Sequence, residues 1–128
     1  MAREKLTTGK PWEKTITHGL GIITSGRLLY TSGITARDPD GNLVGPNDMA
    51  AQLTQIFANL TDILNAAGAD FSQVVKYTVY VTDIDACMAA QSAYRDYYID
   101  NPAATLVEIS KLVIPEMVAE VEAIVALD

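Results

Sequence analysis

The sequence predicts an α+β fold in which a mixed β-sheet is covered on one face by two helices. Three features carry this prediction: a helical pattern of apolar residues after Asp48, a strand of alternating residues over 74–82, and two further apolar segments near the C-terminal end. The elements follow the order β-β-β-α-β-α-β-β. Helical crossovers between strands make part of such a sheet parallel, so the sheet is expected to be mixed.

The first third of the chain reads as short strands and turns. Residues 5–19 form an extended segment that breaks at Gly9-Lys10-Pro11, and residues 21–35 form two short strands joined by a tight turn at Ser25-Gly26. The second of these strands ends at Gly33, where the backbone is permissive.

The stretch "ARDPDGNLVG" predicts a turn with a physical mechanism. Pro39 fixes φ, Asp38 can cap the turn, and Gly41 can adopt the left-handed conformation.

A long helix is predicted directly after this turn. Pro46-Asn47-Asp48 supplies an N-cap and an acidic charge for the first turn, and Gly68 is a good stop. Five apolar residues fall on one helical face: Leu53, Ile56, Phe57, Leu60 and Leu64.

The strand that follows is predicted to be half buried against the helical layer, because its apolar and polar residues alternate. Its inward set is Val75, Tyr77, Val79 and Val81, and its outward set is Lys76, Thr78, Tyr80 and Thr82. A second helix then begins near Asp83 or Asp85 and runs to about Ile99, since Asn101-Pro102 ends it. Its buried face is expected to hold Cys87, Ala90, Tyr94 and Tyr97 or Tyr98.

The segments "ATLVEIS" and "VAEVEAIVAL" are the last two strands, and the second of them carries an anomaly. Its alternation places Glu120 and Glu122 on one face, among residues that otherwise suit a core. Much of the sheet face opposite the helices is apolar or small, so we expect it to be covered by self-association.

Length and composition indicate one domain over residues 1–128. The single cysteine, Cys87, permits no intrachain disulfide, and no apolar run reaches the roughly 18 to 20 residues of a membrane span. The first ten residues lack the apolar centre of a secretion signal. We therefore expect a cytoplasmic protein with no membrane partner.

The charge balance argues against nucleic acid as a partner. Nine basic residues are spread along the chain and are outnumbered by sixteen acidic ones, for a net charge of −7. Nucleic-acid binding needs clustered lysine and arginine. A local basic pocket for one small anion remains compatible with this composition.

The motifs of metal and cofactor chemistry are missing from the sequence. It contains no phosphate-binding glycine loop, no Cys-x-x-Cys pair, no histidine cluster and no G-x-S-x-G. We therefore expect no metal and no cofactor, and chemistry carried by carboxylates, hydroxyls, backbone groups and a lysine.

Three stretches, in order, resemble the RidA/YjgF family of reactive-intermediate (imine and enamine) deaminases. They are "LLYTSGIT", "LTQIFANLTDILNAAGADFSQVVKYTVYVTDI" and "NPAATLVEISKLVIPEMVAEVEAIV". The resemblance covers nearly the whole chain from about Gly21 onward. It implies a chorismate-mutase-like α+β subunit, a homotrimer, and a small-molecule substrate held in clefts between subunits.

The resemblance also implies site residues. Glu122, in "EVEAIV", matches the glutamate that serves the water and proton-transfer chemistry, and Ser32 matches a serine that hydrogen-bonds the ligand, with Gly33 beside it. The backbone around Ala104 and Thr105 belongs to the segment that the family places in the cleft.

The chain departs from the family pattern at the anion-binding position. Ala104 stands where deaminase-type members have an arginine that pairs with the substrate carboxylate, and Leu106 stands where they have a cysteine. A cleft asparagine appears as Gln91, and His18 lies near the place of a tyrosine. The candidates to replace the missing arginine are Lys111, Arg27 and Lys10.

Three functions follow as hypotheses. The first is hydrolysis of an imine or enamine other than a simple 2-imino acid, because Ala104 cannot clamp a carboxylate. The second is a non-catalytic binder or sensor, and the third, ranked last, is RNA cleavage. The same residues also admit structural roles: an interface ion pair for Glu122, a strand end for Ser32, and solvated or structural positions for Gln91 and His18.

Overall fold

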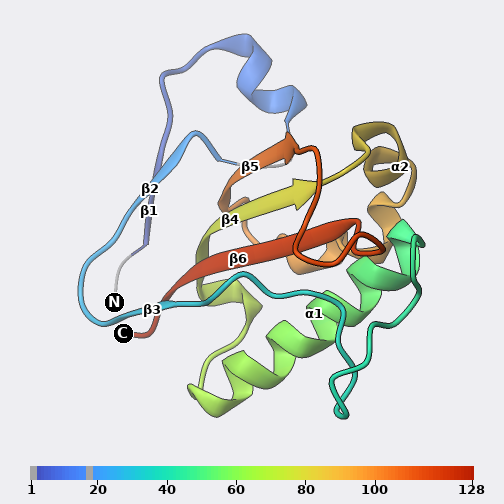
Figure 1. Ribbon diagram of the computed structural model, residues 1–128. Helices are drawn as coiled ribbons and strands as arrows, with labels where there is room; N and C mark the ends of the chain where they lie inside the picture. Colours follow the sequence, from blue (N-terminus) through green and yellow to red (C-terminus); the bar gives the residue numbers. More distant parts are fainter. Residues whose placement is uncertain (1–2, 17–18) are drawn as a thin grey trace.

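The computed structural model describes residues 3–16 and 19–128 (Figure 1). The strands are β1 (Glu4–Leu6), β2 (Gly21–Ile23), β3 (Leu28–Tyr30), β4 (Val74–Val81), β5 (Ala103–Glu108) and β6 (Ala119–Ala126). The α-helices are α1 (Met49–Ala66) and α2 (Ile84–Ala89), and the 3₁₀ turns are η1 (Pro11–Thr15), η2 (Phe71–Gln73), η3 (Gln91–Ala93) and η4 (Arg95–Tyr97).

The main sheet has the strand order β3-β6-β4-β5, with β4 and β5 parallel and the other pairs antiparallel. The long helix α1 lies across one face of this sheet (Figure 1). The predicted α+β fold with a mixed sheet is therefore confirmed.

The alternation of β4 and β6 builds the core between the sheet and α1. Tyr77 and Val79 of β4 are buried on the helix side, as are Val121 and Val125 of β6. The five apolar residues predicted for the face of α1 are all buried. The Asp48 carboxylate accepts a hydrogen bond from the Ala51 backbone N–H at 3.1 Å and caps the helix, as predicted.

The two strands around Ser25-Gly26 exist, but they do not pair with each other. β2 pairs with β1 in a separate two-stranded ribbon beside the main sheet, and β3 pairs with β6 (Figure 1). The chain end explains the choice of partner, because the Asp128 carboxylate accepts from the Arg27 backbone N–H at 2.8 Å and holds the start of β3 against the end of β6.

The second predicted helix is wrong in its second half. α2 ends at Ala89, and the chain continues as the 3₁₀ turns η3 and η4. These tighter turns bring the tyrosines to different partners: Tyr97 stacks on Phe57 at 4.8 Å between ring centroids, and Tyr98 stacks on Tyr77 at 4.6 Å. The predicted burial of Cys87 and Tyr94 is confirmed.

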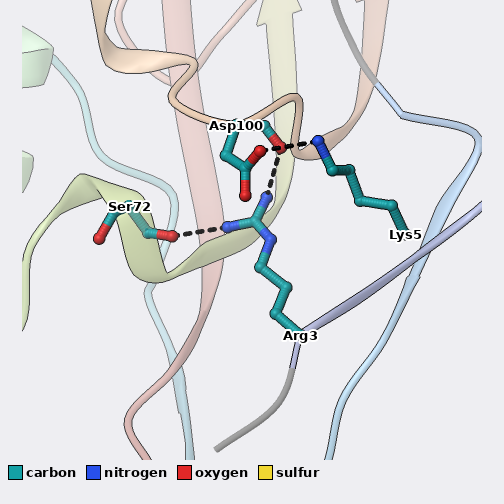
Figure 2. A network of polar contacts seen from close by, with 4 residues as sticks. All are labelled: Arg3, Lys5, Ser72 and Asp100. Atoms are coloured by element: carbon teal, nitrogen blue, oxygen red, sulfur yellow. Dashed lines mark hydrogen bonds and ion pairs between the residues drawn. The ribbon is translucent and has the colours of Figure 1, made fainter.

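The N-terminal ribbon is attached to the main sheet through the turn before β5. Arg3 donates to the backbone oxygens of Ser72 at 2.6 Å and Asp100 at 3.2 Å, and Lys5 donates to the Asp100 carboxylate at 2.7 Å (Figure 2). The hydrogen bond from Lys5 lowers the pKa of Asp100. Asp100 and Asn101 both adopt left-handed φ, at 60° and 49°, so these contacts hold a turn that few residue types tolerate.

Gln52 is a polar residue buried in the core, and the apolar pattern of α1 did not predict it. Its side-chain amide donates to the backbone oxygens of Gly45 at 2.9 Å and Glu116 at 2.8 Å, and its oxygen accepts from the Val118 N–H at 2.9 Å. One side chain thus satisfies three backbone groups on two loops.

Replacing Gln52 with alanine is expected to destabilise the protein by about 2–4 kcal/mol, because three backbone groups lose their partner and a void remains. Urea unfolding followed by circular dichroism measures the change. Gln55→Ala, on the same helix with a half-exposed side chain, is the matched control with an expected loss below about 1 kcal/mol. Equal losses in the two variants would contradict the argument.

Glu13 closes a loop around η1 at the protein surface. Its carboxylate accepts from the hydroxyls of Thr7 at 2.5 Å and Thr8 at 2.6 Å, and from the Lys10 backbone N–H at 2.9 Å. These bonds, chiefly that from Thr7, lower the pKa of Glu13 from 4.5 to about 2. Because the folded-state pKa is lowered, the stabilisation is complete above about pH 4.5 and is lost as the pH falls towards 2.

The single tryptophan, Trp12, reports on this loop because it adjoins Glu13. We expect its fluorescence to change between pH 4.5 and 2 in the wild type. In Glu13→Gln this step should be absent, since no group in the loop then titrates there. Far-UV circular dichroism over the same range separates opening of the loop from global unfolding. An unchanged acid transition in Glu13→Gln would refute the assignment.

Candidate functional site

A cavity of about 820 Å³ lies between β5, the turns η3 and η4, and the segment at η1. Three of the residues expected from the sequence to bind substrate line it: Gln91, Ala104 and Thr105. Leu106 lines it as well. The parallel register pairs Ala104 with Tyr77 and Leu106 with Val79, so these two side chains share the helix-facing side of the sheet.

Although Thr105 borders the cavity, its side chain points to the opposite side of β5, onto the open face of the sheet, which is the face away from α1. Its hydroxyl accepts from the Lys76 ammonium at 2.8 Å. In the same row across the strands, Thr105 pairs with Thr78 and Thr78 pairs with Glu122. The sheet thus places the expected catalytic residue two strands away from Thr105.

Glu122 is held by a tyrosine that the sequence did not suggest as a site residue. The Tyr80 hydroxyl donates to Glu122 Oε1 at 2.5 Å, and this hydrogen bond, followed by desolvation, raises the pKa of Tyr80. Tyr80 therefore remains a neutral donor at physiological pH. The strand alternation could have identified it, because Tyr80 and Glu122 both fall on the outward sets of their strands.

Ser32 and Gly33 lie in the chain that continues from β3 along β6. Thr31 and Ile34 anchor this stretch through hydrogen bonds from their N–H groups to the backbone of β6, at 3.0 and 2.8 Å. Ser32 and Gly33 are exposed. A Cβ at Gly33 would overlap the Glu120 carboxylate, so the backbone here approaches Glu120 rather than Glu122.

The expected site residues are therefore spread over the sheet: two groups lie at its opposite edges, and Glu122 lies on the inner strand β6. Ser32 and Gly33 lie with Glu120 beside the β3 edge, and Gln91 and Ala104 line the cavity beside β5. Three strand spacings separate the edges, roughly 14 Å at about 4.8 Å each. A small ligand cannot contact both groups within one subunit.

The residues named as replacements for the missing arginine do not line the cavity. Arg27 is paired with Asp128 at 3.1 Å, beside β3. Lys10 and Lys111 are exposed on the segment before η1 and the loop after β5. His18, also expected near the site, lies outside the described residues.

Among the described residues that line the cavity, Arg95 alone is cationic, and it was not among the site residues expected from the sequence. The available signal was its position four residues after Gln91, which places both on one face of a helical segment. Buried Cys87 is not exposed to this space, and its burial raises the pKa of its thiol.

Within residues 3–16 and 19–128, no three His, Cys, Asp or Glu side chains are grouped so as to hold a metal ion. None of the helices described there is long and apolar enough to cross a membrane.

Comparison with known proteins relates the chain to one family. The family model described as endoribonuclease L-PSP matches residues 15–127. A RutC family protein of Pyrococcus abyssi is 31% identical over 125 residues, which cover 97% of each chain. The 2-iminobutanoate/2-iminopropanoate deaminase of Rattus norvegicus is 36% identical over 87 residues, which cover 67% of this chain and 64% of that enzyme, so the chain spans less than two thirds of its length.

Two solved structures share the fold. The Rid family protein YyfB of Yersinia pestis, described as a protein of unknown function, superposes with a TM-score of 0.85 at 27% identity, covering 98% of this chain and 99% of that one. The YjgF gene product of E. coli gives a TM-score of 0.69 at 29% identity, covering 85% and 87%. Since the family model matches residues 15–127 and the Pyrococcus abyssi and Yersinia pestis proteins align along nearly all of the chain, the chain belongs to the RidA/YjgF family.

Proposed function

We propose that this protein is a cytoplasmic, homotrimeric enzyme that hydrolyses a reactive imine or enamine to a carbonyl compound and ammonia. The observation that carries the proposal is the division of the expected site into two groups at opposite sheet edges. The name of the rat relative, an imine deaminase, supports the reaction class.

A trimer would complete the site. The open face of the sheet carries Tyr80, Glu120, Glu122 and Ile124, all half buried, and Tyr30 projects from its edge with 67% of its surface exposed. Packing this face against a neighbour would cover these residues. To complete the site, the Ser32–Gly33 group of one subunit would have to meet the β5 edge of the next, beside the cavity, since roughly 14 Å separates the two sheet edges within one subunit.

The reaction needs a water molecule and a proton carrier. Water adds to the carbon of the C=N bond, the nitrogen gains a proton, and the resulting carbinolamine loses ammonia as the C=O bond forms. A carboxylate can accept the proton from water and return it to the nitrogen, so the steps balance without an oxidant or reductant.

Two carboxylates are placed to do this. The sequence pointed to Glu122, which accepts the Tyr80 hydrogen bond. Two observations favour Glu120 as the carboxylate that touches the substrate. It lies against the Gly33 backbone, beside Ser32, and it has no hydrogen-bond partner within the described residues, whereas Glu122 already accepts from Tyr80. We assign proton transfer to Glu120, with Glu122 and Tyr80 beside it as a polar support roughly 7 Å along the strand.

Substituting each carboxylate by glutamine tests this assignment. We expect Glu120→Gln to lower the rate of ammonia release by 100-fold or more and Glu122→Gln by about 10-fold, since removing general acid–base catalysis typically costs 10²–10⁴-fold. The substrates are imines generated in situ by amino-acid and amine oxidases. A large loss in Glu122→Gln alone would restore the role to Glu122.

Tyr80→Phe is the matched control for the Glu122 hydrogen bond, because it removes only the hydroxyl. Its rate should resemble that of Glu122→Gln. Size-exclusion chromatography with light scattering verifies that each variant keeps the wild-type mass, which we expect to be that of a trimer. No acceleration by the wild type on any imine would refute deamination.

The residue at position 104 tests substrate choice. Ala104 lines the cavity at the place where deaminase-type members of the family carry arginine, so we expect slow turnover of simple 2-imino acids. Ala104→Arg should raise kcat/KM for these substrates by at least 10-fold, because a guanidinium can bind the carboxylate through two hydrogen bonds. Ala104→Gln supplies a shorter polar side chain without the charge and should show no gain. No gain in a folded Ala104→Arg trimer would count against this geometry.

A non-catalytic binder is the second candidate, favoured by the apolar side chains of Ala104 and Leu106 in the cavity. It predicts ligand-dependent thermal stabilisation without turnover. Glutamine at position 120 or 122 would then change affinity alone.

A further inference from the structure

The 820 Å³ cavity combines an apolar wall with one guanidinium. Six side chains supply the wall: Ile16, Val79, Met88, Tyr94, Tyr98 and Leu106. Its volume falls within the range of about 300–1,000 Å³ that suits small organic ligands, and far exceeds what an imine of two or three carbons would fill.

Arg95 is the charged partner in this space. Its side chain is exposed and makes no hydrogen bond or ion pair with any residue that the structure describes. A guanidinium that lines a cavity and is not engaged by the protein is available for a ligand anion. Its planar group fits a carboxylate through two parallel hydrogen bonds.

The small side chain of Ala104 explains how such a ligand would fit. A long cation on β5 would project into the cavity from the sheet, whereas Arg95 approaches from η4, on the helical side. The anion position is therefore displaced from the strand, and an apolar ligand body can occupy the space next to Ala104 and Leu106.

We propose that this cavity binds amphipathic monocarboxylates, with the apolar body against its wall and the carboxylate on Arg95. As a statement about substrate, this rests on the proposed deaminase function: the preferred imine or enamine then carries its carboxylate at a distance from the reactive carbon. As a statement about binding, it stands on the cavity alone.

Asp96 also lines the cavity and works against an anion. Successive residues of a 3₁₀ turn point about 120° apart, so Asp96 and Arg95 approach the space from different directions. No ion pair joins them within the described chain. The negative charge of Asp96 should therefore weaken anion binding. Removing that charge in Asp96→Asn should strengthen binding, the opposite of the effect expected for Arg95→Gln.

Isothermal titration calorimetry with a matched pair of ligands tests the proposal. 3-Phenylpropionate and 3-phenylpropionamide have the same apolar body and differ in the charge of the head group. We expect the wild-type protein to bind the acid at least 10-fold more tightly than the amide. Arg95→Gln should abolish that preference, Arg95→Lys should retain part of it, and Asp96→Asn should increase it.

Lys111→Gln is the control for net charge, since Lys111 is exposed and does not line the cavity. It should leave the preference unchanged. Failure of both ligands to bind the wild type would overturn the proposal. The proposal would also be overturned if Arg95→Gln kept the preference for the acid over the amide. The same holds if Lys111→Gln lowered that preference as much as Arg95→Gln does.

Kinetics on imines separates this inference from the proposed function. Arg95→Gln should raise KM for a carboxylate-bearing imine more than KM for a neutral imine of the same size, with little change in kcat. If the wild type binds 3-phenylpropionate through Arg95 but hydrolyses no imine, the deaminase proposal fails and the anion site stands. If imines are hydrolysed and Arg95→Gln changes nothing, the anion site fails and the deaminase stands.

Discussion

The pairing of β6 on both of its edges is the constraint on which the rest of the structure depends. β3 and β4 fix its register from the two sides, and the two-residue period of the strand then decides where every side chain points. Val121 and Val125 fill the core under α1, so Glu120 and Glu122 must point the other way. A slip of one residue would bury both carboxylates without partners, at a cost of several kcal/mol each.

The position of β6 between β3 and β4 also places the expected site residues, but it leaves the site incomplete within one subunit. Because β6 lies between β3 and β4, Glu120 is near the Gly33 backbone but two strand spacings away from β5 and the cavity beside it. The left-handed turn at Asp100 and Asn101, held by Arg3 and Lys5, sets where β5 starts and so where Ala104 lies. Assembly is therefore part of the proposed chemistry, because only a neighbouring subunit can bring the two groups to one ligand.

Local patterns were enough to predict the elements that depend on local physics. The apolar spacing of α1, the alternation of β4 and the Asp48 cap were all confirmed, because periodicity and capping are properties of neighbouring residues. The pairing of β2 with β1 and the early end of α2 depend on contacts between distant segments, among them the rings of Phe57 and Tyr97. The approach of Gly33 to Glu120 is of the same kind: it joins residues 87 positions apart, and no local pattern signals it.

An acidic protein can still bind a small anion, because charge acts over a limited range. At physiological ionic strength the Debye length is about 8 Å, so most of the charges behind the net value of −7 are screened at any one point. A monocarboxylate in the cavity would interact chiefly with Arg95 and Asp96, the charged residues that line it within the described chain. A nucleic acid would instead lie across many surface carboxylates at once, and it would find too few lysines and arginines grouped to neutralise its phosphates. The charge distribution that disfavours RNA is thus compatible with recognition of a single carboxylate.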